Sequence, residues 1–158
     1  MRKLLVLIII ILLLITGCTK KENQITSTEF YPTYNYIDIK LDTFFRNIPI
    51  TIGEYNAVRT SQSSKNEGDA NIYEYDNFEI ETYYDKNEEK IYLIRITSEE
   101  QLTNEGIKIG DTKEQMISIY GKDYINVEDC IFIYNLSNTN LSFYIENDII
   151  KEIVYYVS

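Results

Sequence analysis

The fold is decided by a stretch in the C-terminal third of the chain, CIFIYNLSNTNLSFYIENDIIKEIVYY (residues 130–156). Apolar and polar residues alternate, or nearly alternate, in three runs at 130–134, 140–145 and 149–156. This period of two is typical of β-strands with one buried face. Segments rich in Asn, Ser and Asp separate the runs and have the composition of turns. The stretch therefore predicts an antiparallel meander.

A second set of runs lies earlier in the chain, at 71–76, 78–84 and 90–96. These runs are rich in Ile and Tyr, which favour strands. The Asp76-Asn77 pair and the polar segment 85–89 are suited to the turns between them. The sequence therefore predicts two meanders.

A helix is predicted between the meanders, from Thr112 to Tyr120. Asp111 is placed to cap it, with Glu114 completing a capping box. Apolar residues at i, i+3 and i+4, starting from Met116, give a short stripe that should bury Met116 and Tyr120 against a sheet. Gly121 is placed to end the helix in a left-handed conformation.

The two halves of the chain show an internal repeat. The segment Ile50–Glu54 (ITIGE) parallels Ile107–Asp111 (IKIGD), and Ile72–Tyr75 (IYEY) parallels Ile131–Tyr134 (IFIY). The order and the spacing of the corresponding segments agree between the halves.

The repeat predicts an α+β fold. Each of the two copies is expected to hold a short helical turn followed by a three-to-four-stranded antiparallel meander. The first repeat would occupy residues 36–98 and the second repeat residues 99–158.

The segment GIKIGDTKEQMISIYG (residues 106–121) resembles a turn-and-helix motif of small bacterial lipoproteins. That group includes the small lipoprotein of the outer-membrane barrel-assembly machinery and the two-repeat β-lactamase inhibitor protein. The resemblance covers residues 105–158 and, more faintly, 49–97. The chain is also similar to tandem-repeat lipoproteins of low-GC Gram-positive bacteria. The resemblance implies a helix packed on one face of an antiparallel sheet and a protein-binding function, and it assigns no contact residues.

The N-terminus has the features of a signal peptide. Arg2 and Lys3 precede an apolar run of twelve residues, Leu4–Ile15. As a helix this run is about 18 Å long, shorter than the roughly 30 Å hydrocarbon core of a bilayer, so it indicates a cleaved signal rather than a membrane span. The segment LITGC, ending at Cys18, resembles the bacterial lipobox. That resemblance implies attachment of a diacylglyceryl group to the Cys18 sulfur and cleavage before it.

We therefore expect residues 1–17 to be the signal peptide and residues 18–35 to form a polar, lipidated tether. The protein would lie at the cell surface, on the outer face of the cytoplasmic membrane, held by lipid on Cys18. The chain has 25 acidic against 15 basic residues, a net charge of −10. Such a charge disfavours nucleic acid and anionic headgroups as partners.

The composition argues against an enzyme. The chain contains no His, which excludes Ser-His-Asp and Cys-His machinery and removes the commonest zinc ligand. Carboxylate pairs occur only in predicted turns, where they should be solvated, and segment 85–89 lacks the glycine and the length of a calcium loop. Cys130, at the start of a strand, is expected to be a buried and inert thiol. We expect no cofactor, metal or catalytic residue.

Tyrosines on the predicted strands are the candidate contact residues. By alternation about half should face the core, and the others would line an exposed face suited to binding. The candidate interaction surface comprises Tyr73, Tyr75, Tyr83, Tyr92, Tyr134, Tyr144 and Tyr156. The sequence thus predicts a non-enzymatic protein-interaction module. The alternative is a lipoprotein that binds cell-wall glycan or a small ligand, and a third reading is a carboxylate-based hydrolase.

Overall fold

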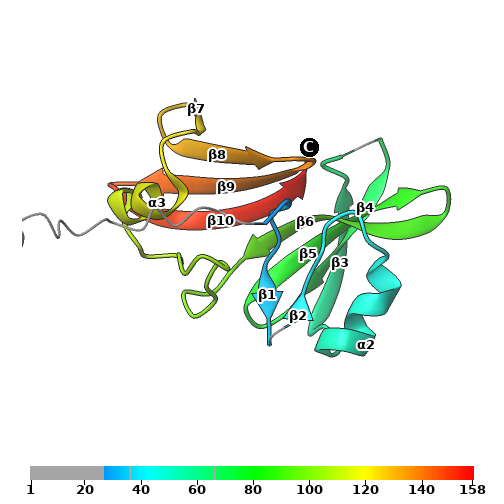
Figure 1. Ribbon diagram of the computed structural model, residues 1–158. Helices are drawn as coiled ribbons and strands as arrows, with labels where there is room; N and C mark the ends of the chain where they lie inside the picture. Colours follow the sequence, from blue (N-terminus) through cyan, green and yellow to red (C-terminus); the bar gives the residue numbers. More distant parts are fainter. Residues whose placement is uncertain (1–26, 36, 66) are drawn as a thin grey trace, which may run out of the picture.

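A computed structural model describes residues 27–35, 37–65 and 67–158 of the protein. These residues form one eight-stranded antiparallel sheet in the order β3-β4-β5-β6-β10-β9-β8-β7, together with a small two-stranded sheet, β1-β2 (Figure 1). The small sheet is made by β1 (Thr33–Tyr34) and β2 (Ile37–Asp38). The strands of the large sheet are β3 (Ala57–Gln62), β4 (Asp69–Glu74), β5 (Phe78–Asp85), β6 (Glu88–Ile96), β7 (Ile125–Val127), β8 (Ile131–Leu136), β9 (Thr139–Glu146) and β10 (Ile149–Val157).

Helical structure in the described residues is short. It consists of a 3-10 turn η1 (Phe45–Asn47), which leads into the five-residue helix α2 (Ile48–Ile52), and the eight-residue helix α3 (Lys113–Tyr120). None of these helices has the length and apolar character needed to cross a bilayer.

The expected α+β fold of two repeats is wrong. The protein is mostly β, and all strands from β3 to β10 belong to a single continuous sheet. The two sets of strands meet where Leu93–Ile96 of β6 pairs with Ile153–Tyr156 of β10. This pairing satisfies the backbone hydrogen bonds of two strand edges. It also brings Ile94 and Ile153, which are fully buried, into one core.

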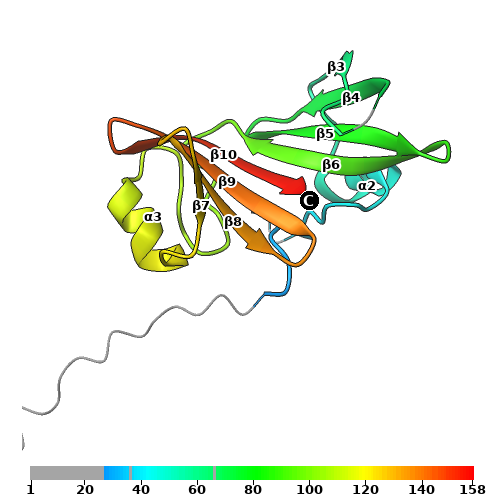
Figure 2. The ribbon, with the colours of Figure 1, turned by 90° about the horizontal axis from the view of Figure 1, so that it is seen from above.

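The core lies on one face of the sheet. Helices α2 and α3 and the β1-β2 sheet all cover this face, as two perpendicular views show (Figures 1 and 2). Phe45 and Ile48 anchor the α2 region in the core, and Met116 and Tyr120 anchor α3. The predicted burial of Met116 and Tyr120 is confirmed.

The cap of α3 differs from the prediction by one residue. The Thr112 hydroxyl accepts a hydrogen bond from the Gln115 backbone N–H at 3.2 Å, and the Thr112 N–H donates to the Gln115 side chain at 2.8 Å. Asp111 is used elsewhere, because its carboxylate accepts from the Lys108 N–H at 3.0 Å and closes the preceding turn. The capping box is therefore Thr112 and Gln115, in place of Asp111 and Glu114.

The N-terminal part of the described chain packs on the covered face. The Phe30 side chain is buried, and its backbone N–H donates to the Thr139 hydroxyl at 2.7 Å. Ile39, after β2, is fully buried. The expected tether of residues 18–35 is thus corrected: from Ser27 on, this segment is part of the folded domain, because Phe30 is an apolar anchor within it. Cys18 and the predicted signal peptide lie outside the described residues.

Cys130 is half-buried rather than buried. It belongs to the turn before β8, where Glu128 and Asp129 have positive φ of 52° and 59°. The sequence placed Cys130 on a strand, but this turn keeps its side chain near the surface.

Candidate protein-interaction face

The face of the sheet opposite the helices, here called the open face, has no described helix or strand packed over it (Figures 1 and 2). The β3–β4 connection reaches part of this face, where Ser64 binds Glu81 and the Lys65 ammonium lies 5.3 Å from the ring centroid of Tyr92. In β8, Phe132 and Tyr134 point into the core, so by alternation Ile131 and Ile133 point to the open face. A strand that is apolar on both sides is typical of a sheet buried on both faces. The composition of β8 therefore fits a sheet whose second face is covered by another molecule.

Neighbouring strands extend the apolar surface. Ile125 and Val127 of the edge strand β7 are paired with Ile133 and Ile131 of β8, and both are exposed. In β10, Val154 lies opposite Ser142 of β9, which in turn lies opposite Ile133. Contiguous exposed apolar residues of this kind mark interaction sites more often than chance surface exposure does.

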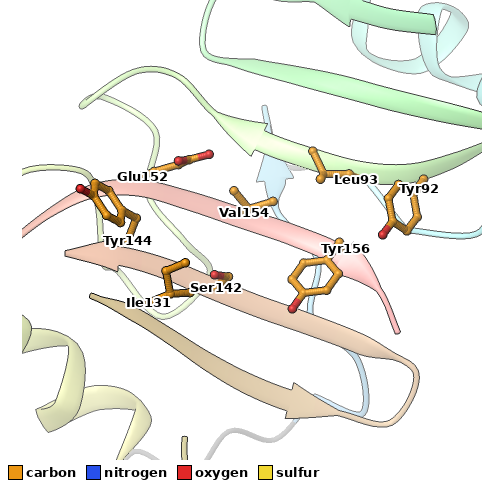
Figure 3. A pocket seen from close by; sticks show the side chains of 8 residues that line it. All are labelled: Tyr92, Leu93, Ile131, Ser142, Tyr144, Glu152, Val154 and Tyr156. Carbon is orange, nitrogen blue, oxygen red and sulfur yellow. The ribbon is translucent and has the colours of Figure 1, made fainter. Parts of the chain in front are cut away.

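A hollow of about 330 Å³ lies on the open face where β6, β10, β9 and β8 run side by side (Figure 3). Tyr144 stands at one end, and Tyr156 and Tyr92 stand at the other. The complete lining is Tyr92, Leu93, Ile131, Ser142, Tyr144, Glu152, Val154 and Tyr156. An apolar floor between aromatic ends is suited to an inserted apolar side chain.

A bulge in β6 brings Tyr92 to this hollow. Ile94 faces the core, so strict alternation would turn Tyr92 to the core as well. The register with β5 shifts between Glu81 and Thr82, so Tyr92 is the extra residue between Leu93 and Ile91. Ile91 then returns to the core and is fully buried, while Tyr92 lines the hollow beside Leu93.

Charged residues form a ladder across the open face beside the hollow. Arg59 of β3 contacts Glu74 of β4 at 3.1 Å and Glu79 of β5 at 3.3 Å. Arg95 of β6 contacts Glu79 at 3.8 Å and also pairs with Glu152 of β10. These pairs are partly exposed, and each contributes little to stability. The open face thus combines a charged half over β3–β6 with an apolar half over β7–β10.

The structure separates the predicted interaction tyrosines. Tyr92, Tyr144 and Tyr156 come together at the hollow. Tyr73 and Tyr134 are buried in the core, which corrects their assignment to an exposed surface. Their strand positions are those that alternation turns inward.

Tyr75 and Tyr83 also lie outside the hollow. Tyr75 is half-buried and stacks on Phe78, with ring centroids 4.9 Å apart. Tyr83 is buried beside the hollow, with its ring centroid 6.3 Å from that of Tyr92. Its hydroxyl donates to Asp42 at 2.6 Å, and the Lys65 ammonium lies 4.7 Å from its ring centroid. Tyr83 offers no free contact surface, so its assignment is corrected. Tyr75 is only half-buried, and its assignment stays a prediction.

The environment of Tyr83 keeps its hydroxyl protonated. Burial, followed by the hydrogen bond to the Asp42 carboxylate, raises the pKa of Tyr83 to about 12. At the hollow, burial raises the pKa of Tyr92, with a smaller contribution from Glu81, and burial also raises the pKa of Tyr156. These tyrosines therefore act as neutral donors and contact surfaces rather than as acids or bases near neutral pH.

The raised pKa of Tyr83 predicts a loss of stability in alkali. Unfolded Tyr83 loses its proton at pH about 10, whereas folded Tyr83 keeps it to about 12. The protonated Tyr83 hydroxyl therefore contributes fully to the free energy of unfolding below pH 10, and this contribution is lost as pH rises towards 12. We expect Tyr83→Phe to make the fall in the free energy of unfolding shallower over this range, as measured by urea titrations at stepped pH. Tyr84→Phe, at the next, exposed position, is the matched control. Equal slopes for Tyr83→Phe and the wild type would contradict the prediction.

Sequence reasoning missed the aliphatic part of the site. Leu93, Ile131 and Val154 form much of the hollow, yet only tyrosines were proposed as contacts. The signal was present in IFIY at 131–134, where four successive residues are apolar. An alternating, half-buried strand would carry polar residues at two of these positions.

The lining of the hollow is mainly aliphatic and aromatic. Glu152 is the only ionisable carboxylate in the hollow, and Arg95 pairs with it. Within the described residues, no group of three or more Cys, Asp or Glu side chains is placed to hold a metal ion.

Two solved structures are similar to the chain at low sequence identity. The crystal structure of the uncharacterized protein yfeY from Escherichia coli is 12% identical, over 83% of this chain and 97% of that chain, with a TM-score of 0.49. The crystal structure of a DUF4309 family protein, YjgB, from the low-GC Gram-positive bacterium Bacillus subtilis is 14% identical, over 73% of this chain and 79% of that chain, with a TM-score of 0.43. No protein-family model and no curated protein matches the sequence.

Proposed function

We propose that the protein is an extracytoplasmic lipoprotein, anchored to the outer face of the cytoplasmic membrane through Cys18, that binds a protein partner with the open face of its sheet. It acts without catalysis. The anchor is proposed from the lipobox-like LITGC segment at 14–18. The binding function is proposed from the apolar open face.

The observation that carries the binding proposal is the two-sided apolar character of β8. Ile131 and Ile133 are only partly buried, although residues of their type on both sides of a strand usually have a covering layer. A partner that inserts an apolar side chain between Tyr144 and Tyr156 would supply this layer. Buried aromatic anchors of this kind contribute most of the binding energy in protein interfaces.

The net charge of the chain restricts the kind of partner surface that we expect. With a net charge of −10, the protein attracts surfaces of opposite sign. The Arg95–Glu152 pair at the edge of the hollow can exchange partners with charged groups beside an inserted side chain. We therefore propose a partner with an apolar contact region and a basic rim, whose association slows as salt is raised.

The position of Phe30, near the start of the described residues, is compatible with binding at the open face. Phe30 enters the core from the covered face. The described N-terminal segment therefore lies on the covered side of the sheet, away from the hollow (Figure 2). A partner can approach the hollow from the side opposite this segment.

Site-directed photocrosslinking in living cells tests the proposal. A benzoylphenylalanine residue replaces Ser142, a small residue in the lining of the hollow, in the full-length protein. We expect a protease-sensitive adduct with one protein, lost when Val154→Asp places a charge beside the probe. Thr60→Asp, on the exposed strand β3, is the matched control and should leave the adduct intact.

The outcomes separate the alternatives. A protease-resistant adduct, with glycan or lipid, would overturn the protein-partner proposal. An adduct that survives Val154→Asp would show that the hollow is not the contact.

A further inference from the structure

A second concave site lies apart from the open face, between the β1-β2 sheet and the connection that follows β6. This polar groove has a volume of about 720 Å³ and shares no lining residue with the hollow. Three separate parts of the chain contribute to it: β1 with its turn, the β4–β5 loop, and the connection at 100–104. The lining is Thr33, Tyr34, Asn35, Asn77, Glu100, Gln101, Leu102, Thr103 and Asn104.

The composition of the polar groove restricts what it can bind. It contains no Lys or Arg, so nothing in the lining would neutralise a phosphate or a carboxylate. It has a single carboxylate, Glu100, too few acidic groups for a polyvalent cation. Tyr34 and Leu102 are its larger apolar residues, too few to bury an apolar ligand. The remaining side chains are amides and hydroxyls, which hydrogen-bond to neutral donors and acceptors.

Two of the amides are held in place by the surrounding backbone. The Gln101 side-chain nitrogen donates to the Thr33 and Leu102 carbonyls at 3.0 and 2.9 Å. The Asn104 side-chain nitrogen donates to the Tyr31 carbonyl at 3.0 Å. Each amide oxygen is thereby oriented and keeps its acceptor capacity. Groups ordered in advance lose less entropy when they bind a ligand.

Asn77 supplies hydrogen-bond donors, which complement the acceptor oxygens of Gln101 and Asn104. It is half-buried, and its side-chain amide has no hydrogen-bond partner among the described residues, although its backbone carbonyl accepts from Thr97 at 2.9 Å. Beside it, the ring of Tyr34 packs edge-on against Phe78, with centroids 5.1 Å apart. This contact orients a partly exposed aromatic ring next to an amide with free donors.

We propose that the polar groove binds a neutral oligosaccharide carrying acetamido groups. Sugar hydroxyls both donate and accept, so they can satisfy the Asn77 amide and the oriented oxygens of Gln101 and Asn104 together. An acetamido group adds a donor and an acceptor of the same kind as these side chains. The apolar face of a sugar ring packs on Tyr34, and Leu102 contacts an acetamido methyl group. This proposal is independent of protein binding at the open face.

Calorimetric titration of the full-length protein in detergent micelles with triacetylchitotriose tests the proposal. We expect saturable binding that Asn77→Ala weakens by about tenfold, as for the loss of one hydrogen bond. Leu102→Asp, at a residue that is 47% exposed, should weaken binding without disturbing the fold. Asn135→Ala, an exposed asparagine on the open face, is the matched control and should leave affinity unchanged.

Three results would overturn the proposal. The first is no binding of the trisaccharide by the wild type. The second is equal affinity for the wild type and both groove variants. The third is equally tight binding of the anionic trigalacturonate, which the lining has no cation to receive. None of these results bears on the crosslinking test, because the polar groove and the hollow share no residue.

Discussion

Replacing Phe143 with alanine is expected to lower the free energy of unfolding by about 3–5 kcal/mol. Phe143 is fully buried at the centre of β9, and its ring lies 5.3 Å from that of Tyr120 and 6.1 Å from that of Tyr134. Truncation removes these contacts and leaves a cavity between the sheet and α3. The loss is a large share of the roughly 5–15 kcal/mol that stabilises a typical domain. Urea denaturation followed by tyrosine fluorescence measures it.

Tyr144→Ala is the matched control for this change. Tyr144 is the next residue in the chain, but it points to the open face and is 37% exposed. We expect its truncation to cost about 1 kcal/mol or less, within the range of surface changes. Comparable losses for Phe143→Ala and Tyr144→Ala would mean that the two faces of β9 are equally covered, contrary to the structure.

Cys18→Ala is expected to abolish lipid attachment completely. If the lipobox-like segment is processed as proposed, the Cys18 sulfur is the acceptor of the lipid, and alanine offers no nucleophile in its place. Two acyl chains anchor a protein stably, whereas none leaves it free of the membrane unless the signal peptide is retained. Metabolic labelling with an alkyne-bearing fatty acid, followed by detection on the isolated protein, measures the attachment.

The chain provides its own control for this experiment. It has two cysteines, and the second, Cys130, lies in a turn of the folded domain. Cys130→Ala should keep the full fatty-acid label. Label that persists in Cys18→Ala, or that disappears in Cys130→Ala, would contradict the assignment of Cys18.

The regular strands were predictable because their side chains carry a period of two. Predicted runs at 78–84 and 140–145 correspond to β5 and β9 within one residue at each end. The helix from Thr112 was also predictable, because its stripe buries Met116 and Tyr120. The choice of Asp111 over Thr112 as the cap was wrong. Both residue types cap helices, and the Asp111 side chain instead accepts from the Lys108 N–H in the preceding turn.

The edge strands were not predictable in the same way. All six residues of β3 (AVRTSQ) are exposed, so this strand has no buried face and no apolar period. Its extended form depends on hydrogen bonds with β4, a partner that local sequence does not reveal. The fold class was wrong because the pairing of β6 with β10 joins the two predicted meanders into one continuous sheet.

The candidate site depends on the bulge in β6, and β10 has a second bulge where its register with β9 shifts between Ile150 and Glu152. Ile91 and Ile94 are three residues apart and both fully buried, as are Ile150 and Ile153 of β10. Strict alternation cannot put such residues on one face, so the spacing indicates an extra residue in each strand. The sequence does not say which residue is extra, and therefore could not place Tyr92 on the open face.

Strand β10 lies in the middle of the sheet but is the last strand in sequence, so the sheet is completed only after β10 has been synthesised. The Leu93–Ile96 part of β6 keeps an unpaired edge until β10 joins it, and the residues that pair, such as Leu93 and Tyr156, are far apart in sequence. During synthesis the β3–β6 part therefore exposes the backbone N–H and C=O groups of this edge until β10 has been made. Late closure at the middle of a sheet leaves an aggregation-prone edge in the nascent chain. A chaperone that shields β6 would matter most in this interval.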